Sequence, residues 1–156
     1  MAGPPAKSMV IASLFDRLTD YEPRNSREVL PPERDQREAY KASVARDLTN
    51  LLNTRRSEAD IPEEFEYTRE SLAAYGVQDF TTAPMDREAI RRAVERTVRR
   101  FEPRLSRVQV TEVEAGSLTY LFRISGMLRV ELGLEPVVYD ADLPAESRRF
   151  RVKPGR

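Results

Sequence analysis

The sequence contains neither cysteine nor histidine. Without cysteine there is no disulfide framework, no thiol nucleophile and no thiolate metal site. Without histidine there is no Ser-His-Asp triad, no imidazole base and no ordinary transition-metal site. Enzymatic chemistry is thereby restricted to carboxylates, lysine, tyrosine or a phosphate-binding loop.

Lysine and glycine are also scarce. Lys7, Lys41 and Lys153 are the only lysines among the 26 basic residues, so the positive charge comes mainly from arginine. Arginine stays charged and makes planar, bidentate contacts, which suit interfaces better than proton transfer. The six glycines form no G-x-G-x-x-G or G-x-x-x-x-G-K pattern, so nucleotide binding has no support. The composition favours a binding protein without a cofactor or a metal.

Long apolar runs are missing as well. None approaches the roughly 20 residues that a membrane-spanning helix needs, and the first eight residues lead into no apolar stretch typical of a secretory signal. The chain has 156 residues with 26 acidic and 26 basic side chains, for which one compact domain is expected. We place a flexible tail at residues 1–12, a single domain at 13–152 and a C-terminal tail at 153–156.

Helical periodicity dominates the chain up to residue 101. A weak helical segment is predicted at 11–18, and loops at 21–32 and 57–67. A short helix is predicted over 68–75, ended by Gly76, and another from 82–84 to Phe101, stopped by Pro103. The clearest helix is predicted over 33–56, where apolar side chains recur at steps of three and four: Tyr40, Val44, Leu48, Leu51 and Leu52.

After Leu105 the apolar period falls to two, which is typical of strands. Strands are predicted near 108–111, 118–132, 137–139 and 150–152, with a turn at 115–117. Gly126 marks a bulge or a close approach of two backbones. Helices therefore precede strands, and the predicted fold class is α+β, with N-terminal helices packed on a C-terminal antiparallel β-sheet in a single domain.

The segment that joins the last helix to the first strand carries the main candidate residues. Pro103 fixes the backbone between two opposite charges, Glu102 and Arg104. This arrangement suits a fixed recognition point as well as a structural hinge. Glu102 is also the most interesting single carboxylate for acid–base chemistry, although an ion pair with Arg104 explains it more simply.

A stripe of arginines on the helix before this corner has two interpretations. Arg92, Arg96 and Arg99 lie opposite the apolar face and would suit contacts with phosphates. Glu88 and Glu95 flank the stripe, however, and the net charge of the chain is zero. A solvated or protein-facing surface is therefore the simpler interpretation.

The edges of the predicted sheet leave a second question open. A meander exposes at least one strand edge, and proteins normally protect such edges with charges or bulges. Arg148 and Arg149 beside the last strand either provide this protection or flank a docking edge for a partner strand.

Six stretches spread over residues 13–152 form an ordered pattern: Ser13–Leu18, Arg46–Arg55, Ser71 with Tyr75–Gly76 and Asp79, Phe101–Leu105, the alternating Phe122–Leu128 and Pro136–Asp140. In order and spacing this pattern resembles the TssE family of type VI secretion baseplate subunits, which is related to a contractile-phage baseplate wedge protein. It departs from the family at Val77–Gln78, where Leu-Pro is expected.

The resemblance implies a non-enzymatic baseplate wedge component of the bacterial cytoplasm. Its partners would be the wedge proteins TssF, TssG and TssK, with no nucleic acid and no insertion into a membrane. A fold similar to the strand-exchanging domain of the sheath would make it the seed for TssB and TssC strands. The family's Glu-Pro-Arg motif maps onto Glu102, Pro103 and Arg104 as partner-binding residues within the wedge.

Two alternatives come from other functional classes. Some relatives carry a lysozyme-like label, which would correspond to a carboxylate-dependent peptidoglycan hydrolase with Glu102 as general acid. The arginine stripe would correspond to a nucleic-acid-binding module.

Overall fold

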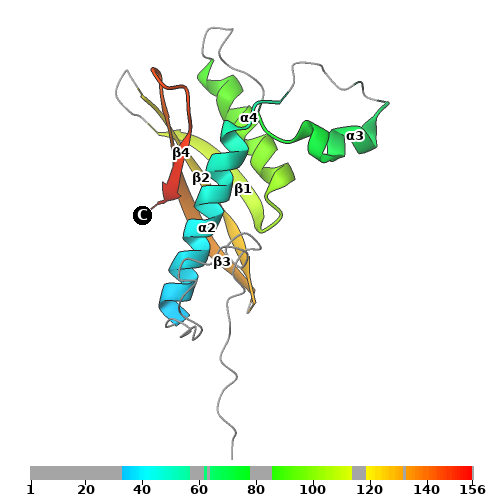
Figure 1. Ribbon diagram of the computed structural model, residues 1–156. Helices are drawn as coiled ribbons and strands as arrows, with labels where there is room; N and C mark the ends of the chain where they lie inside the picture. The colour runs from blue at the N-terminus through cyan, green and yellow to red at the C-terminus, as the bar shows by residue number, and fades with distance from the viewer. Residues whose placement is uncertain are drawn as a thin grey trace, which may run out of the picture.

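The computed structural model describes residues 33–56, 62, 64–77, 86–113, 119–131 and 133–155. Two long helices, α2 (Glu33–Asn53) and α4 (Arg87–Phe101), frame a small arm made of α3 (Glu66–Glu70) and the 3-10 helix η1 (Leu72–Ala74). The strands β1 (Leu105–Val113), β2 (Thr119–Val130), β3 (Gly133–Pro144) and β4 (Arg151–Pro154) follow. The predicted α+β class with helices before strands is confirmed (Figure 1).

Four predicted segments lie outside the described residues: the tail at 1–12, the helix at 11–18, the loop at 21–32 and the turn at 115–117. None of the described helices is both long and apolar enough to cross a membrane.

The four strands form one antiparallel sheet in the order β1-β2-β3-β4. One face of the sheet carries both long helices, with α2 against β4 and α4 against β1 (Figure 1). The opposite face is polar in part and holds the ion pair between Arg123 and Asp140. The core lies between the helices and the sheet and includes Val44, Leu48, Leu52, Ile90, Val94, Val98, Leu105, Val108, Val110, Phe122, Ile124, Leu128, Tyr139, Ala141 and Leu143.

Helix α2 ends at Asn53, three residues before the predicted end at 56. The backbone N–H and the hydroxyl of Thr54 both donate to the Asn50 carbonyl, at 3.0 and 2.8 Å, which closes the last turn. Arg55 then forms an isolated bridge with Val77 and leaves the helix axis. The apolar face predicted for this helix is confirmed, because four of its five residues are buried and Tyr40 is partly buried.

The predicted helix over 68–75 is wrong as a single element. Ser71 has extended geometry with ψ of 174° and separates α3 from η1. Its side-chain oxygen accepts a hydrogen bond from the Ala73 N–H at 3.2 Å and so caps the second piece. Helix α4 begins at Arg87, where the Asp86 carboxylate accepts from the Glu88 N–H at 3.0 Å as the N-cap. The predicted start at 82–84 lies outside the described residues.

Strand β3 is much longer than the predicted segment 137–139. Pro136 and Pro144 argue against a strand in a sequence, since proline cannot donate to a central ladder. In the sheet, however, β4 pairs only with Tyr139–Asp142, so β3 has a single neighbour at both prolines. Strand β4 runs to Pro154, past residue 152, where the sequence analysis ends the domain.

A β-bulge in β1 keeps the apolar side chains of the strand on the face of the sheet that packs against the helices. Ser106 pairs with Met127 and Gln109 pairs with Ser125, so two residues of β1 face the single Gly126. The bulge lets both Leu105 and Val108 point to the helix-covered face despite their odd spacing. The close approach predicted at Gly126 is confirmed, since a Cβ there would lie 3.0 Å from the Ser106 carbonyl oxygen.

Arg107 supplies the left-handed residue of this bulge, with φ of 52°. Left-handed geometry costs a non-glycine residue about 1 kcal/mol or more. We therefore expect Arg107→Gly to raise the free energy of unfolding by about 1 kcal/mol, measured by urea denaturation. Arg107→Ala removes the same side chain and keeps the strain, so it is the matched control. If Arg107→Gly lowered the free energy of unfolding while Arg107→Ala left it unchanged, the bulge would not be strained.

Candidate functional site

The corner between α4 and β1 is built by backbone hydrogen bonds on both sides. The Glu102 N–H donates to the Val98 carbonyl at 3.0 Å and completes α4. The Leu105 N–H donates back to the Glu102 carbonyl at 3.1 Å, while the Arg104 carbonyl accepts from Arg129 of β2 at 2.8 Å. Pro103 lies at the exposed tip of this turn. The corner is therefore fixed to the helix and to the sheet at once.

The two charges of the corner meet each other inside the protein. Glu102 is only 4% exposed. One of its oxygens accepts from the Arg104 Nε at 2.6 Å and from the Arg104 backbone N–H at 3.2 Å, and the other accepts from the second guanidinium nitrogen. Both oxygens are thus occupied, as in a bidentate arginine–carboxylate pair.

Arg104 also ties the corner to α2. Its terminal nitrogen lies 2.8 Å from the Asp47 carboxylate. Burial works against the charge of Arg104, but its hydrogen bonds to Glu102 and Asp47 outweigh this effect and raise the pKa of the guanidinium. One arginine therefore joins three elements, α2, the end of α4 and the start of β1.

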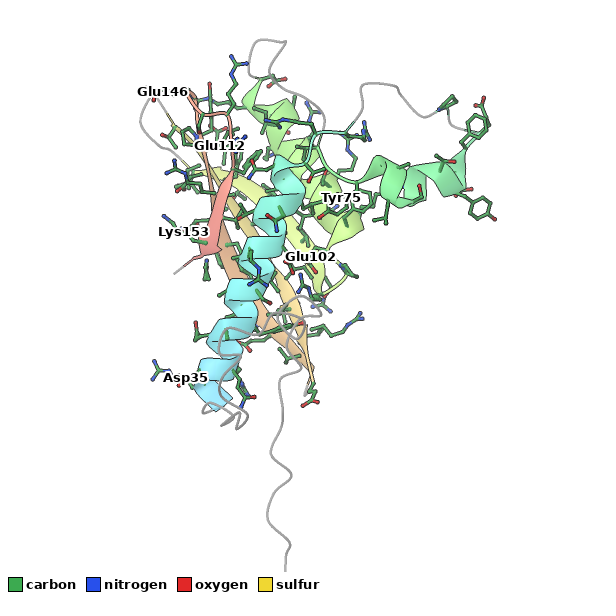
Figure 2. All side chains as sticks on the ribbon, in the orientation of Figure 1. Asp35, Tyr75, Glu102, Glu112, Glu146 and Lys153 are labelled. Carbon is green, nitrogen blue, oxygen red and sulfur yellow. The ribbon has the colours of Figure 1, made fainter. Side chains whose placement is uncertain are left out.

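A pocket of about 340 Å³ lies beside this cluster. Tyr75 and Phe101 meet edge to face on its wall, with ring centroids 5.4 Å apart. Figure 2 shows Tyr75 and Glu102 on the same side of α2. Burial, reinforced by the carboxylates of Asp47 and Glu102, raises the pKa of the Tyr75 hydroxyl. The pocket is lined by Asp47, Leu51, Tyr75, Phe101, Glu102, Pro103 and Arg104.

A buried tyrosine close to the charged cluster belongs to the same region. Tyr139 of β3 is fully buried, and its hydroxyl has no hydrogen-bond partner among the described residues. Burial raises the pKa of this hydroxyl, and the nearby charge of Glu102 adds to the rise. The phenol is therefore neutral near physiological pH and contributes no charge to the corner.

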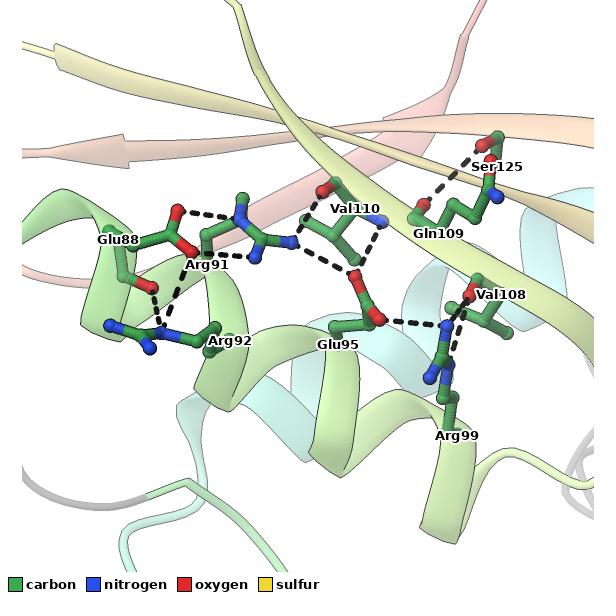
Figure 3. A network of polar contacts seen from close by, with 9 residues as sticks. All are labelled: Glu88, Arg91, Arg92, Glu95, Arg99, Val108, Gln109, Val110 and Ser125. Atoms are coloured by element: carbon green, nitrogen blue, oxygen red, sulfur yellow. Dashed lines mark hydrogen bonds and ion pairs between the residues drawn. The ribbon is translucent and has the colours of Figure 1, made fainter.

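The three arginines of the predicted stripe on α4 make different contacts in the structure. Arg92 pairs with Glu88 at 3.5 Å. Arg99 turns toward β1, where its Nε and a terminal nitrogen donate to the Val108 carbonyl at 3.0 and 2.7 Å (Figure 3). All three arginines are exposed and line one shallow surface pocket, so the predicted position opposite the apolar face is confirmed. The sequence did not indicate that Arg99 is also long enough to reach the edge of the sheet.

Sequence analysis identified the three corner residues but missed their partners on other elements. Asp47 belongs to a resembling stretch, and its spacing of four from Leu51 places it at the margin of the buried face of α2. An acid in that position is a recognisable signal for an ion pair at the edge of a core. Among the described residues, no group of three or more acidic side chains could hold a metal ion.

Comparison with known proteins gives one family match. A family model described as baseplate wedge protein gp25 matches residues 38–132, which is more than half of the chain. The matched range runs from α2 through the corner to the end of β2. No curated protein and no solved structure matches.

Proposed function

This chain belongs to the baseplate wedge protein gp25 family, and from this premise we propose that it is the wedge subunit of a type VI secretion baseplate. The family is one of structural baseplate proteins with phage tail-like assembly. The observation that carries the finer proposal is the ordered resemblance of residues 13–152 to TssE, including the corner at 102–104. In this role the protein works without catalysis on the cytoplasmic side of the machine.

The corner is the proposed contact with the wedge proteins TssF and TssG, with TssK nearby. Glu102 bonds to Arg104, and Arg104 also bonds to Asp47, so these charges hold the turn in one shape. Pro103 is exposed and borders the pocket of Tyr75 and Phe101, which suits the reception of an apolar side chain of a partner. The partner would thus meet a preorganised surface, which lowers the entropic cost of binding.

The hydrolase alternative gains no support from this geometry. A general acid must present a protonated carboxyl to a substrate within a cleft. Glu102 is buried and has both oxygens engaged by Arg104. The nucleic-acid alternative is also weakened, because Arg99, one of its three proposed phosphate contacts, donates its hydrogen bonds to the backbone of β1.

The sheet is the proposed seed for the sheath. Four antiparallel strands with a helix-covered face can accept a further strand at an edge, where main-chain hydrogen bonds give affinity. We propose that strands of TssB and TssC add to this sheet and that sheath assembly begins there.

The corner is tested by Pro103→Glu in co-purification with TssF and TssG. The glutamate is exposed in the free protein but would be buried by a bound partner, so it should reduce retention of the wedge proteins at least about tenfold, as expected for a residue at the centre of an interface. The melting temperature should change little, because Pro103 is exposed. Pro154→Glu makes the same substitution at an exposed proline of β4 and is the matched control. Equal retention of both variants would contradict the corner contact, and no retention of the wild type would contradict the wedge role.

A further inference from the structure

The outer edge of β1 is covered by side chains of α4. The Val110 N–H donates to the Glu95 carboxylate at 3.2 Å, and the Val110 carbonyl accepts from Arg91 at 3.0 Å. The Val108 carbonyl accepts two hydrogen bonds from Arg99. Arg91, Glu95 and Arg99 recur every four residues, so they form one row along the helix (Figure 3). This row, which we call the α4 cover, occupies the positions at which a neighbouring strand would bond.

The outer edge of β4, together with Phe150 directly before it, is closed in a different way. The Phe150 N–H and carbonyl bond to the side chain of Asn53 at 2.9 and 2.8 Å. The Val152 N–H donates to the Thr49 hydroxyl at 3.2 Å. The next outward position is Pro154, which has no N–H. An incoming strand would find no available backbone donor along Phe150, Val152 and Pro154.

The two closures differ in how readily they open. Thr49 and Asn53 are short, partly buried side chains on α2, and the Thr49 hydroxyl is held in place by a second hydrogen bond, to the Ala45 carbonyl at 2.8 Å. The α4 cover consists of long, partly exposed side chains, of which Arg99 is 55% exposed. Arg91 also bonds Glu88 at 2.7 Å, and Arg99 pairs with Glu95 at 2.8 Å. These charges therefore keep partners when they rotate away from β1, which lowers the cost of uncovering the edge.

We propose that the β1 edge, and not the β4 edge, receives the sheath strand, and that this strand displaces the α4 cover from Val108 and Val110. The proposal rests on the proposed seeding of sheath strands and names the site for it. An added strand supplies an N–H for each carbonyl and a carbonyl for the Val110 N–H, so every backbone group keeps a partner after the exchange. Until then the cover protects the edge from pairing with other chains.

Amide hydrogen exchange on the full chain tests the cover. The variant Glu95→Ala with Arg99→Ala should accelerate exchange of the Val110 amide at least about tenfold, since a charge-assisted hydrogen bond is lost. Arg92→Ala with Arg96→Ala truncates two exposed charged side chains of α4 at the same spacing, and neither of them bonds to β1 or belongs to the α4 cover. This control should leave Val110 unchanged. The Ile124 amide in β2 reports whether each variant is folded. A Val110 amide that exchanges equally in both variants would overturn the cover.

Seeding of sheath by purified TssB and TssC on the wedge tests the edge. Glu112→Pro removes an outward N–H from β1, since strand alternation turns Glu112 the same way as Val110, whereas Val152→Pro removes one from β4. We expect the first to reduce the rate of seeding at least about tenfold and the second to leave it unchanged. The variant without the cover should seed faster than the wild type. Seeding that fails with Val152→Pro but not with Glu112→Pro would overturn the assignment of the edge. A wild type that seeds no sheath, with Val110 still protected, would instead refute the seeding function and with it the docking of a strand.

Discussion

Arg104→Ala is expected to lower the free energy of unfolding by about 3–5 kcal/mol, the range found when one partner of a buried ion pair is removed. Glu102 would keep its carboxylate in a site where it is 4% exposed and would lose the donor to both oxygens. Asp47 would lose its link to the corner at the same time. Denaturation in urea at neutral pH measures this loss.

Two variants separate a buried unpaired charge from the simple loss of a side chain. Adding Glu102→Gln to Arg104→Ala removes the charge that is left behind, so the double variant should be more stable than Arg104→Ala alone. Arg123→Ala breaks the ion pair with Asp140 on the open face of the sheet, where Arg123 is 43% exposed. This control should cost about 1 kcal/mol or less. Equal losses for Arg104→Ala and Arg123→Ala would mean that Glu102 is compensated by another group.

Gly76→Ala should lower the free energy of unfolding by about 3 kcal/mol or more, again measured by urea denaturation. Gly76 has φ of 106°, and a Cβ there would lie 2.4 Å from the Thr54 carbonyl oxygen. That oxygen accepts from the Val77 N–H at 2.9 Å and joins η1 to the end of α2. The added methyl group would force the two segments apart, and with them the wall of the pocket beside Tyr75.

Gly133→Ala isolates the contribution of the backbone angle. Gly133 also has a positive φ, of 135°, but no atom lies within 4 Å of a Cβ placed there. We expect a loss of about 1–2 kcal/mol from strain alone. If Gly76→Ala lowers the free energy of unfolding no more than Gly133→Ala does, the chain relieves the clash with Thr54 by a small shift. The close contact between Gly76 and Thr54 would then not be needed to keep η1 against α2.

The elements with strong periodicity were predictable, and the failures have local causes. The apolar steps of α2 and the alternation around Phe122 and Ile124 predict the correct element types. The break at Ser71 depends on a side-chain cap that competes with continuation of the helix. The spacing of apolar residues gives no information about such a cap. The length of β3 depends on where β4 happens to pair, a tertiary fact that decides whether prolines are tolerated.

The corner could be located from sequence, but not its surroundings. Pro103 between two opposite charges indicates a rigid turn, and the structure has one there. The groups around the pair come from distant parts of the chain, because Asp47 of α2 bonds to Arg104 and Tyr139 of β3 is buried near Glu102. Arg99 illustrates the same limit, because helical angle gives the direction of its Cβ but not the reach of a long side chain to Val108.

The bonds from α2 to β4 set the order in which the chain can fold during synthesis. Asn53 bonds to Phe150, which lies 97 residues later in the chain, and Thr49 bonds to Val152, which lies 103 residues later. Neither hydrogen bond can form before the later residue has been synthesised. A ribosome at roughly 5–20 residues per second adds that stretch in several seconds, during which α2 has no strand to bond. Contacts so distant in sequence also slow closure of the finished chain, because the entropy of a long loop is lost before the contact forms. The helix that appears early is thus completed late, and a nascent chain halted before β4 would leave the polar side of α2 and the edge of β3 open to other molecules.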